Sequence, residues 1–187
     1  MTKFALFGIA TAFLVCGVPA QSQPVPAPAR PPPARDHEWL KQLVGEWEAR
    51  FKMYIQPDQP PAEAAGTASV RALGDHWVVA ETRTTMMGPP FSGMLSLGYD
   101  PLKNRFNGTW IDSFGGHLWV YKGTLNDAGD TMTLETEGPS PQDPAKTARY
   151  KEVIQFTGKD SRTFTSTTEA GDGTWMKIVT IEYRRKK

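Results

Sequence analysis

Cysteine is almost absent from this sequence, and the single residue of this type is Cys16. It ends an apolar run, Phe4–Val15, that follows the lone positive charge of Lys3. This apolar run is too short to span a membrane. With Val18-Pro19-Ala20 as a cleavage site, the pattern predicts a secretory signal peptide over residues 1–20. Its removal would leave a mature chain without cysteine, which excludes disulfides, a thiol nucleophile and a thiolate metal site.

A net charge is also lacking. The whole sequence has 21 Lys and Arg against 20 Asp and Glu, so removal of Lys3 leaves 20 against 20, a formal net charge of 0. Nucleic-acid binding needs a positive field, so we expect no nucleic acid as partner. The sequence predicts export to the periplasm or beyond, without stable membrane insertion after cleavage. An uncleaved anchor and a lipid anchor at Cys16 are the alternatives.

Histidine is scarce, with His37, His76 and His117 as the three examples. Their spacing does not match a metal-ligand pattern, and a haem site would require a histidine after His117, on a late strand. Phosphate-binding loops, dinucleotide fingerprints and Gly-x-Ser-x-Gly elbows do not occur in the sequence. We therefore expect neither a metal nor a cofactor.

The part of the chain that would remain divides into a linker and one domain. Six prolines in residues 21–35 predict an extended tether. The domain begins at Asp36, which is placed to cap a short helix ending before Gly45. Trp39, Leu40 and Leu43 share one face of this helix. Residues 36–187 have the length of one ordinary domain.

The rest of the domain consists of short runs in which apolar and polar residues alternate, separated by turn residues. Strands are expected at residues 46–55, 66–73, 76–85, 91–99, 105–113, 117–124, 131–137, 147–157, 162–169 and 174–184. Ten strands joined by hairpin-length turns predict an all-β, antiparallel up-and-down barrel, because closure removes exposed edges. The short helix would serve as its lid. A barrel of this strand number is expected to enclose a cavity.

Two resemblances follow from particular residues. Leu43-Val44-Gly45-Glu46-Trp47 resembles the opening of lipocalins, fatty-acid-binding proteins and nitrobindins. In lipocalins an arginine of the final strand stacks over this tryptophan, which assigns a structural role to Trp47 and Arg184, with Arg185 as the alternative.

The whole domain is similar to the DUF1579 family of uncharacterised bacterial proteins. The pieces that carry the likeness are His37-Glu38-Trp39-Leu40, Gly45-Glu46-Trp47, Leu97-Gly98-Tyr99-Asp100-Pro101, Gly108-Thr109-Trp110-Ile111-Asp112-Ser113, Tyr121-Lys122-Gly123-Thr124 and Tyr183-Arg184-Arg185-Lys186. The resemblance implies a calycin-like barrel and brings no established activity with it.

Candidate site residues lie on the two strands around Gly115-Gly116. Trp110 and Asp112 share a face that the aromatic residues place inside the barrel, and on the next strand Trp119 and Tyr121 share a face with His117. Asp112 could orient a polar ligand group or act as a general base, or it could cap the turn that follows. Asp112 and His117 could form an acid–base pair at one barrel end, or both could belong to an exposed polar rim.

A third strand offers charged candidates. Trp77, Glu81 and Arg83 share one face, with Val78 and Thr82 on the other. If the Trp77 face points inward, the two charges must pair or bind a ligand, and Arg83 would suit a carboxylate. The opposite orientation leaves both charges in water.

Three functions are compatible with this pattern. The first is an exported binding protein that holds a small apolar or amphipathic molecule, with Trp77, Glu81, Arg83, Trp110, Asp112, Trp119 and Tyr121 as ligand-binding residues. The second is a small barrel enzyme with isomerase- or hydrolase-like chemistry, for which Asp112, His117 and Tyr121 are the candidates. The third is a tethered protein-interaction domain, disfavoured because the outward faces are mostly polar. The oligomeric state is left open.

Overall fold

The computed structural model describes residues 35–56, 58–85 and 88–187. The expected signal peptide, and the expected linker apart from its last residue, lie outside these ranges. The described elements are α1 (Arg35–Lys41), β1 (Gly45–Met53), β2 (Ala62–Leu73), β3 (Trp77–Thr85), β4 (Pro90–Asp100), β5 (Arg105–Asp112), β6 (Trp119–Leu125), β7 (Thr131–Pro139), β8 (Thr147–Gly158), β9 (Ser161–Glu169) and β10 (Trp175–Arg185).

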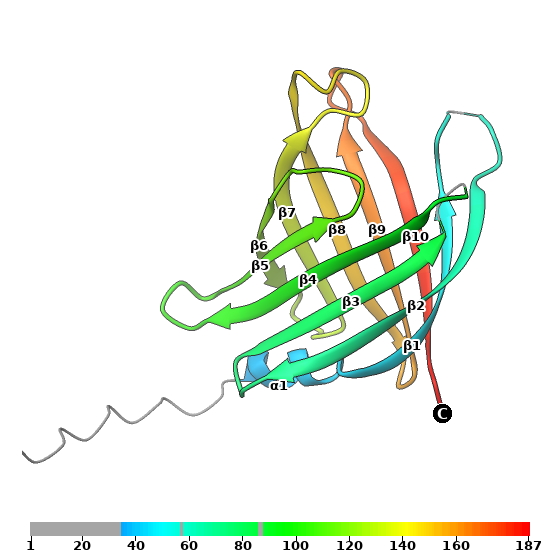
Figure 1. The fold of residues 1–187 in the computed structure, drawn as a ribbon. Helices are drawn as coiled ribbons and strands as arrows, with labels where there is room; N and C mark the ends of the chain where they lie inside the picture. The colour runs from blue at the N-terminus through cyan, green and yellow to red at the C-terminus, as the bar shows by residue number, and fades with distance from the viewer. Residues whose placement is uncertain (1–34, 57, 86–87) are drawn as a thin grey trace, which may run out of the picture. The chain divides into compact units, whose positions relative to one another are not determined.

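The ten strands form one closed antiparallel barrel in which each strand pairs with its sequence neighbours (Figure 1). The barrel closes where β1 pairs with β10 on one side and with β2 on the other. Hairpin-length connections favour this simple meander, and closure leaves no unpaired strand edge. The expected all-β, up-and-down barrel with one short N-terminal helix is confirmed.

Alternation along each strand separates the core from the solvent, as β1 illustrates. Trp47, Ala49, Phe51 and Met53 are buried, whereas Glu46, Glu48 and Arg50 are exposed. Successive side chains of a strand point to opposite faces, so a closed sheet places one set inside. The residues buried in this way form a continuous hydrophobic core with the apolar face of α1.

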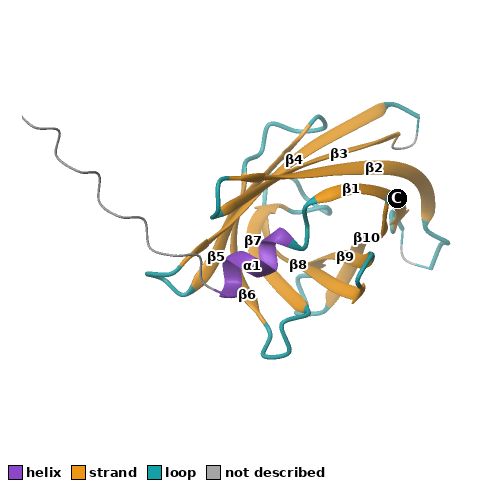
Figure 2. Cartoon of the chain, turned by 90° about the horizontal axis from the view of Figure 1, so that it is seen from below, coloured by secondary structure: helices purple, strands orange, loops and turns teal. Residues whose placement is uncertain are grey.

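Helix α1 lies across one end of the barrel (Figure 2). Trp39 contacts Phe106 and Phe156 edge-on, at ring-centroid distances of 5.9 and 5.5 Å. Leu40 and Leu43 are buried with it. None of the helical structure in the described ranges has the length and apolar character that a membrane span requires.

Trp47 ties α1, β1 and β10 together. Its indole Nε1 donates a hydrogen bond to the Leu43 carbonyl at 2.9 Å, and the Arg185 guanidinium lies 4.1 Å from its ring centroid. Arg184, the residue assigned to this contact from the sequence, is exposed and does not make it. The register explains this correction: Trp47 is opposite Arg185 across β1 and β10, and cross-strand partners point to the same face.

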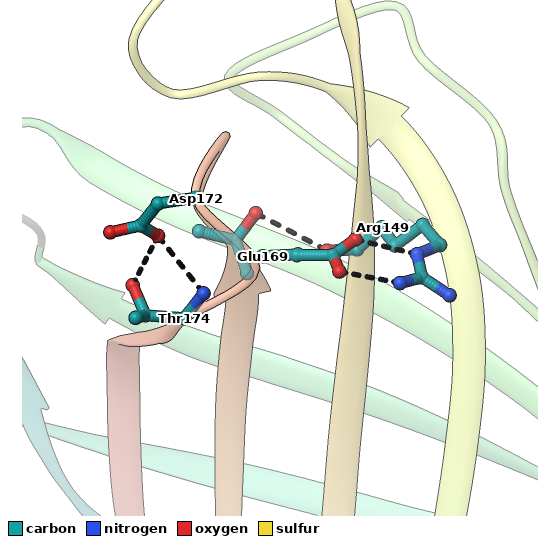
Figure 3. Close-up of polar contacts among 5 residues, drawn as sticks. Arg149, Glu169, Asp172 and Thr174 are labelled. Carbon is teal, nitrogen blue, oxygen red and sulfur yellow. Dashed lines mark hydrogen bonds and ion pairs between the residues drawn. The ribbon is translucent and has the colours of Figure 1, made fainter.

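Local polar contacts stabilise the hairpin that joins β9 to β10, at the barrel end opposite α1 (Figure 3). The Asp172 carboxylate accepts hydrogen bonds from the Thr174 backbone N and Oγ1 at 2.9 and 2.7 Å. Arg149 on β8 pairs with Glu169 on β9 through two guanidinium nitrogens. These contacts hold the pKa values of Asp172 and Glu169 below their ordinary range. The turn chemistry is that of an Asx turn, in which the side chain replaces a backbone acceptor.

Candidate functional site

The barrel encloses a cavity of about 540 Å³. Most of its wall is apolar or aromatic, and a few polar groups interrupt that wall. Its lining comprises Phe51, Met53, Tyr54, Ile55, Ala68, Ala80, Thr82, Phe91, Leu95, Trp110, Asp112, Phe114, Trp119, Tyr121, Pro141, Tyr150, Glu152, Ile154, Arg162, Phe164, Ser166, Ile178, Val179, Ile181 and Tyr183. A concave, mainly apolar space with few convergent polar groups is typical of small-molecule sites.

The mouth of the cavity lies at the barrel end opposite α1. Ile55, which follows β1, and Phe114, which follows β5, both line the cavity and are 59% and 53% exposed. None of residues 36–41 of α1 belongs to the lining, and Trp39 fills the other end of the barrel against Phe106. The helix is therefore a plug at the closed end, whereas the sequence suggested a lid.

Of the two acidic residues in the cavity lining, Glu152 lies deeper than Asp112, which ends β5 near the mouth. It lies on β8, where every second residue, Tyr150, Glu152 and Ile154, points toward the interior. Its Oε2 accepts a hydrogen bond from the Tyr121 hydroxyl at 2.8 Å, and its Oε1 accepts one from Ser166 Oγ at 3.3 Å. Glu152 is half-buried and lines the cavity. Burial raises the pKa of Glu152 to about 7, against the opposing effect of these two hydrogen bonds.

Arg162 is the basic group of the lining, and β9 carries it near the closed end. Its guanidinium lies 3.8 Å from the Tyr183 ring centroid and 4.8 Å from that of Trp47. The side chain is buried, and its Nε has no hydrogen-bond partner within the described residues. Burial lowers the pKa of Arg162 from its ordinary value. A buried cation held by ring faces retains an unmet demand for an anion.

Four of the residues predicted to contact a ligand do line the cavity: Trp110, Asp112, Trp119 and Tyr121. Strands β5 and β6 place them there by alternation, with Trp110 directly opposite Trp119 in the register. Burial raises the pKa of Tyr121, and the neighbouring Glu152 carboxylate raises it further. Tyr121 therefore remains a neutral hydroxyl donor at physiological pH.

The inward orientation considered for Trp77, Glu81 and Arg83 is wrong. Trp77 is 40% exposed, and Glu81 and Arg83 pair with each other at 3.2 Å in solvent on the outer wall. Their strand, β3, instead points Val78, Ala80, Thr82 and Thr84 inward. The alternation of residues in β3 allowed either face of the strand to point inward. Pairing with β2 and β4 selects the orientation that buries the smaller side chains.

Asp112 lines the cavity, and its carboxylate also caps the turn that follows β5. Its Oδ2 accepts a hydrogen bond from Trp110 Nε1 at 2.9 Å, and its Oδ1 accepts one from the Phe114 backbone N at 2.9 Å. The proposed partner His117 is exposed, and its Nε2 faces the Glu137 carbonyl at 3.4 Å. No hydrogen bond joins Asp112 to His117 in the part of the chain that the structure describes. The reason is that β6 begins at Trp119, so His117 belongs to the connecting loop.

The outer wall of β3 to β6 is less polar than the sequence suggested. Met94, Ile111 and Val120 lie on neighbouring strands, and each is at least two-fifths exposed. Two histidines meet elsewhere, at the α1 end, where His76 Nδ1 lies 3.1 Å from His37 Nε2. Within residues 35–56, 58–85 and 88–187, no three His, Cys, Asp or Glu side chains are grouped as metal ligands.

A closed, up-and-down barrel of ten antiparallel strands with a short N-terminal helix is a calycin-like β-barrel. The family model DUF1579, described as "Protein of unknown function", matches residues 32–185, and the chain belongs to this family.

Solved structures agree with the fold. Rv2717c from M. tuberculosis is 16% identical, with a TM-score of 0.58 over 82% of this chain and 99% of that one. The S-type phycobiliprotein lyase CPES from Guillardia theta is also 16% identical, with a TM-score of 0.55 over 81% of this chain and 93% of that one. No curated protein matches the sequence.

Proposed function

We propose that this chain is an exported binding protein that holds a small, largely apolar molecule inside its barrel. The observation that carries the proposal is the cavity of about 540 Å³, within the range of roughly 300–1,000 Å³ found for small-molecule sites. Tyr121, Glu152, Ser166 and Arg162 supply the few polar contacts that would orient a ligand. The export part of the proposal depends on the sequence of residues 1–20, whose charge and apolar run are those of a signal peptide.

A neutral fluorescent probe of apolar sites tests this function. N-phenyl-1-naphthylamine should bind the purified domain at a ratio of one to one, with increased emission, because the cavity removes its rings from water. Ala80 lines the cavity and is buried, so Ala80→Phe should fill part of the space and weaken binding at least about tenfold.

The matched control is Val120→Phe, which adds the same ring to the exposed outer wall of β6. It should leave the affinity for the probe unchanged. A wild-type domain that fails to bind the probe, or equal losses of affinity in the two variants, would refute the cavity as the binding site.

An acid–base enzyme is the second candidate, and Glu152 is the observation that favours it. A carboxyl group with a pKa of about 7 can both give and take a proton near neutral pH. Tyr121 beside it could donate a hydrogen bond to a developing negative charge. A panel of chromogenic esters and lactones is a direct screen. Turnover that depends on one ionisation near pH 7 and is lost in Glu152→Gln would support catalysis, and turnover retained in that variant would contradict it.

A further inference from the structure

Arg162 is a buried cation whose side-chain hydrogen-bond partner is the neutral Tyr183 hydroxyl and not a carboxylate. Its guanidinium is buried against the rings of Tyr183 and Trp47. Among the ion pairs of the described residues none includes Arg162, whereas Arg185, which also lies over the Trp47 ring, pairs with Asp160 at 3.1 Å. The Nε of Arg162 is left without an acceptor. Buried cations are ordinarily paired, because desolvation penalises an isolated charge.

The same side chain lines the cavity, and its place along the barrel is deep. Arg162 is the second residue of β9, next to the hairpin that joins β8 to β9 at the α1 end. The mouth at Ile55 and Phe114 is at the opposite end. Between them the wall is mainly apolar and aromatic, with Phe51, Leu95, Phe164 and Ile181 among its residues, and Asp112, Tyr121, Glu152 and Ser166 interrupt it. A mainly apolar tube with its one cation at the inner end is complementary to an amphipathic molecule that enters headgroup first.

We propose that the cavity takes an amphipathic molecule with a carboxylate headgroup, which pairs with Arg162 while the apolar tail extends along the barrel toward the mouth. This inference rests on the proposed function and names the chemical class of its ligand. A planar guanidinium with a free N–H matches a carboxylate in geometry and charge. A single basic residue in the lining favours one negative charge over the two of a phosphate monoester, since the lining also contains Asp112 and Glu152.

Glu152 makes the affinity for such a ligand depend on pH. The groups that face it are Tyr121 from β6, Ser166 from β9 and the apolar Leu134 from β7, its register partner. The other titratable groups in the lining are Tyr54, Asp112, Tyr150, Arg162 and Tyr183. Burial raises the pKa values of Tyr121, Tyr150 and Tyr183, so these hydroxyls stay neutral near pH 7.

The direction of the effect follows from charge. Above its pKa of about 7 the Glu152 carboxylate repels a bound anion, and below that pH it is neutral. A fatty carboxylate in water remains ionised through this window, because an ordinary carboxyl pKa is about 4 to 5. Affinity for the anion should therefore rise severalfold as the pH falls from about 8 to about 6, whereas affinity for a neutral analogue should not change.

The test is displacement of N-phenyl-1-naphthylamine by decanoate and by decanol, two molecules with the same chain and different headgroups. At about pH 6 decanoate should displace the probe at a concentration about tenfold lower than decanol, since charge-assisted hydrogen bonds are stronger than neutral ones. Arg162→Met should remove this preference. Arg83→Met, which removes an exposed arginine of the outer wall, should keep it.

Glu152→Gln provides a measurement that does not depend on the folding of an Arg162 variant. It preserves an acceptor for Tyr121 and removes the charge, so decanoate affinity should become constant between about pH 6 and 8 at the higher, low-pH value. Probe binding with no preference for decanoate over decanol in the wild type would overturn this inference and leave the binding function standing. Failure of the wild type to bind the probe would overturn the binding function itself.

Discussion

Replacement of Trp47 by alanine is expected to lower the free energy of unfolding by about 4 kcal/mol. Trp47 is fully buried and donates a hydrogen bond to the Leu43 carbonyl. Two guanidinium groups lie near its ring, with Arg185 at 4.1 Å and Arg162 at 4.8 Å from its centroid. The substitution therefore removes a large apolar side chain, two cation–π contacts and the link between α1 and β1. Chemical unfolding in urea, followed by circular dichroism, measures the loss.

Trp77→Ala is the matched control, since it removes the same side chain from the outer wall. Trp77 is 40% exposed and covers Gly98 on the neighbouring strand. Only the covered part of its surface is returned to water, so we expect a loss of about 1 kcal/mol or less. Equal losses in the two variants would show that Trp47 does not hold the closed end of the barrel together.

The barrel could be predicted from the sequence because its strands repeat one simple pattern. In β1 every second residue from Trp47 to Met53 is apolar, and Gly, Asn and Asp mark the turns between the later strands. Each of the ten expected strands corresponds to an observed one, and the differences are confined to their ends. Helix α1 ends at Lys41, yet Leu43 beyond it is buried as its spacing predicted.

Which face of a strand points inward could not be predicted in the same way where both faces contain apolar residues. In β3 both faces contain apolar residues, so alternation alone does not say whether Trp77 or Val78 points inward. The pairing of β3 with β2 and β4 decides this, and it is a property of three strands together. The choice between Arg184 and Arg185 has the same origin, because it depends on the register of β10 against β1.

Glu152 and Arg162 were missed for a different reason. A charged residue on a strand ordinarily faces solvent, so its charge alone gives no reason to place it inside the barrel. The sequence did contain a usable signal. Glu152 shares a strand face with Tyr150 and Ile154, and Arg162 shares one with Phe164. Such a charge in a barrel strand indicates a polar group inside the cavity, which is how this barrel differs from one filled by its own side chains.

Glu152→Gln is expected to stabilise the protein at alkaline pH and to leave it nearly unchanged in acid. The pKa of Glu152 rises from 4.5 to about 7 on folding, so the folded state holds its proton more tightly than the unfolded state. The stability contributed by the protonated carboxyl is complete below about pH 4.5 and is lost as the pH rises through about 7. With 1.36 kcal/mol for each pKa unit, the wild type loses about 3 kcal/mol over this range relative to a residue that does not titrate.

Glutamine cannot ionise, so the gain in the variant should increase from near zero at about pH 4 to about 3 kcal/mol at about pH 8. Urea unfolding of both proteins across this range measures the difference directly. Glu169→Gln is the control of opposite sign, because Arg149 holds the pKa of Glu169 below its ordinary value and the neutral variant should lose stability above that pKa. A constant difference between wild type and Glu152→Gln would mean that the Glu152 carboxylate is hydrated through the cavity. In that case it would also cease to be the group that couples anion binding to pH.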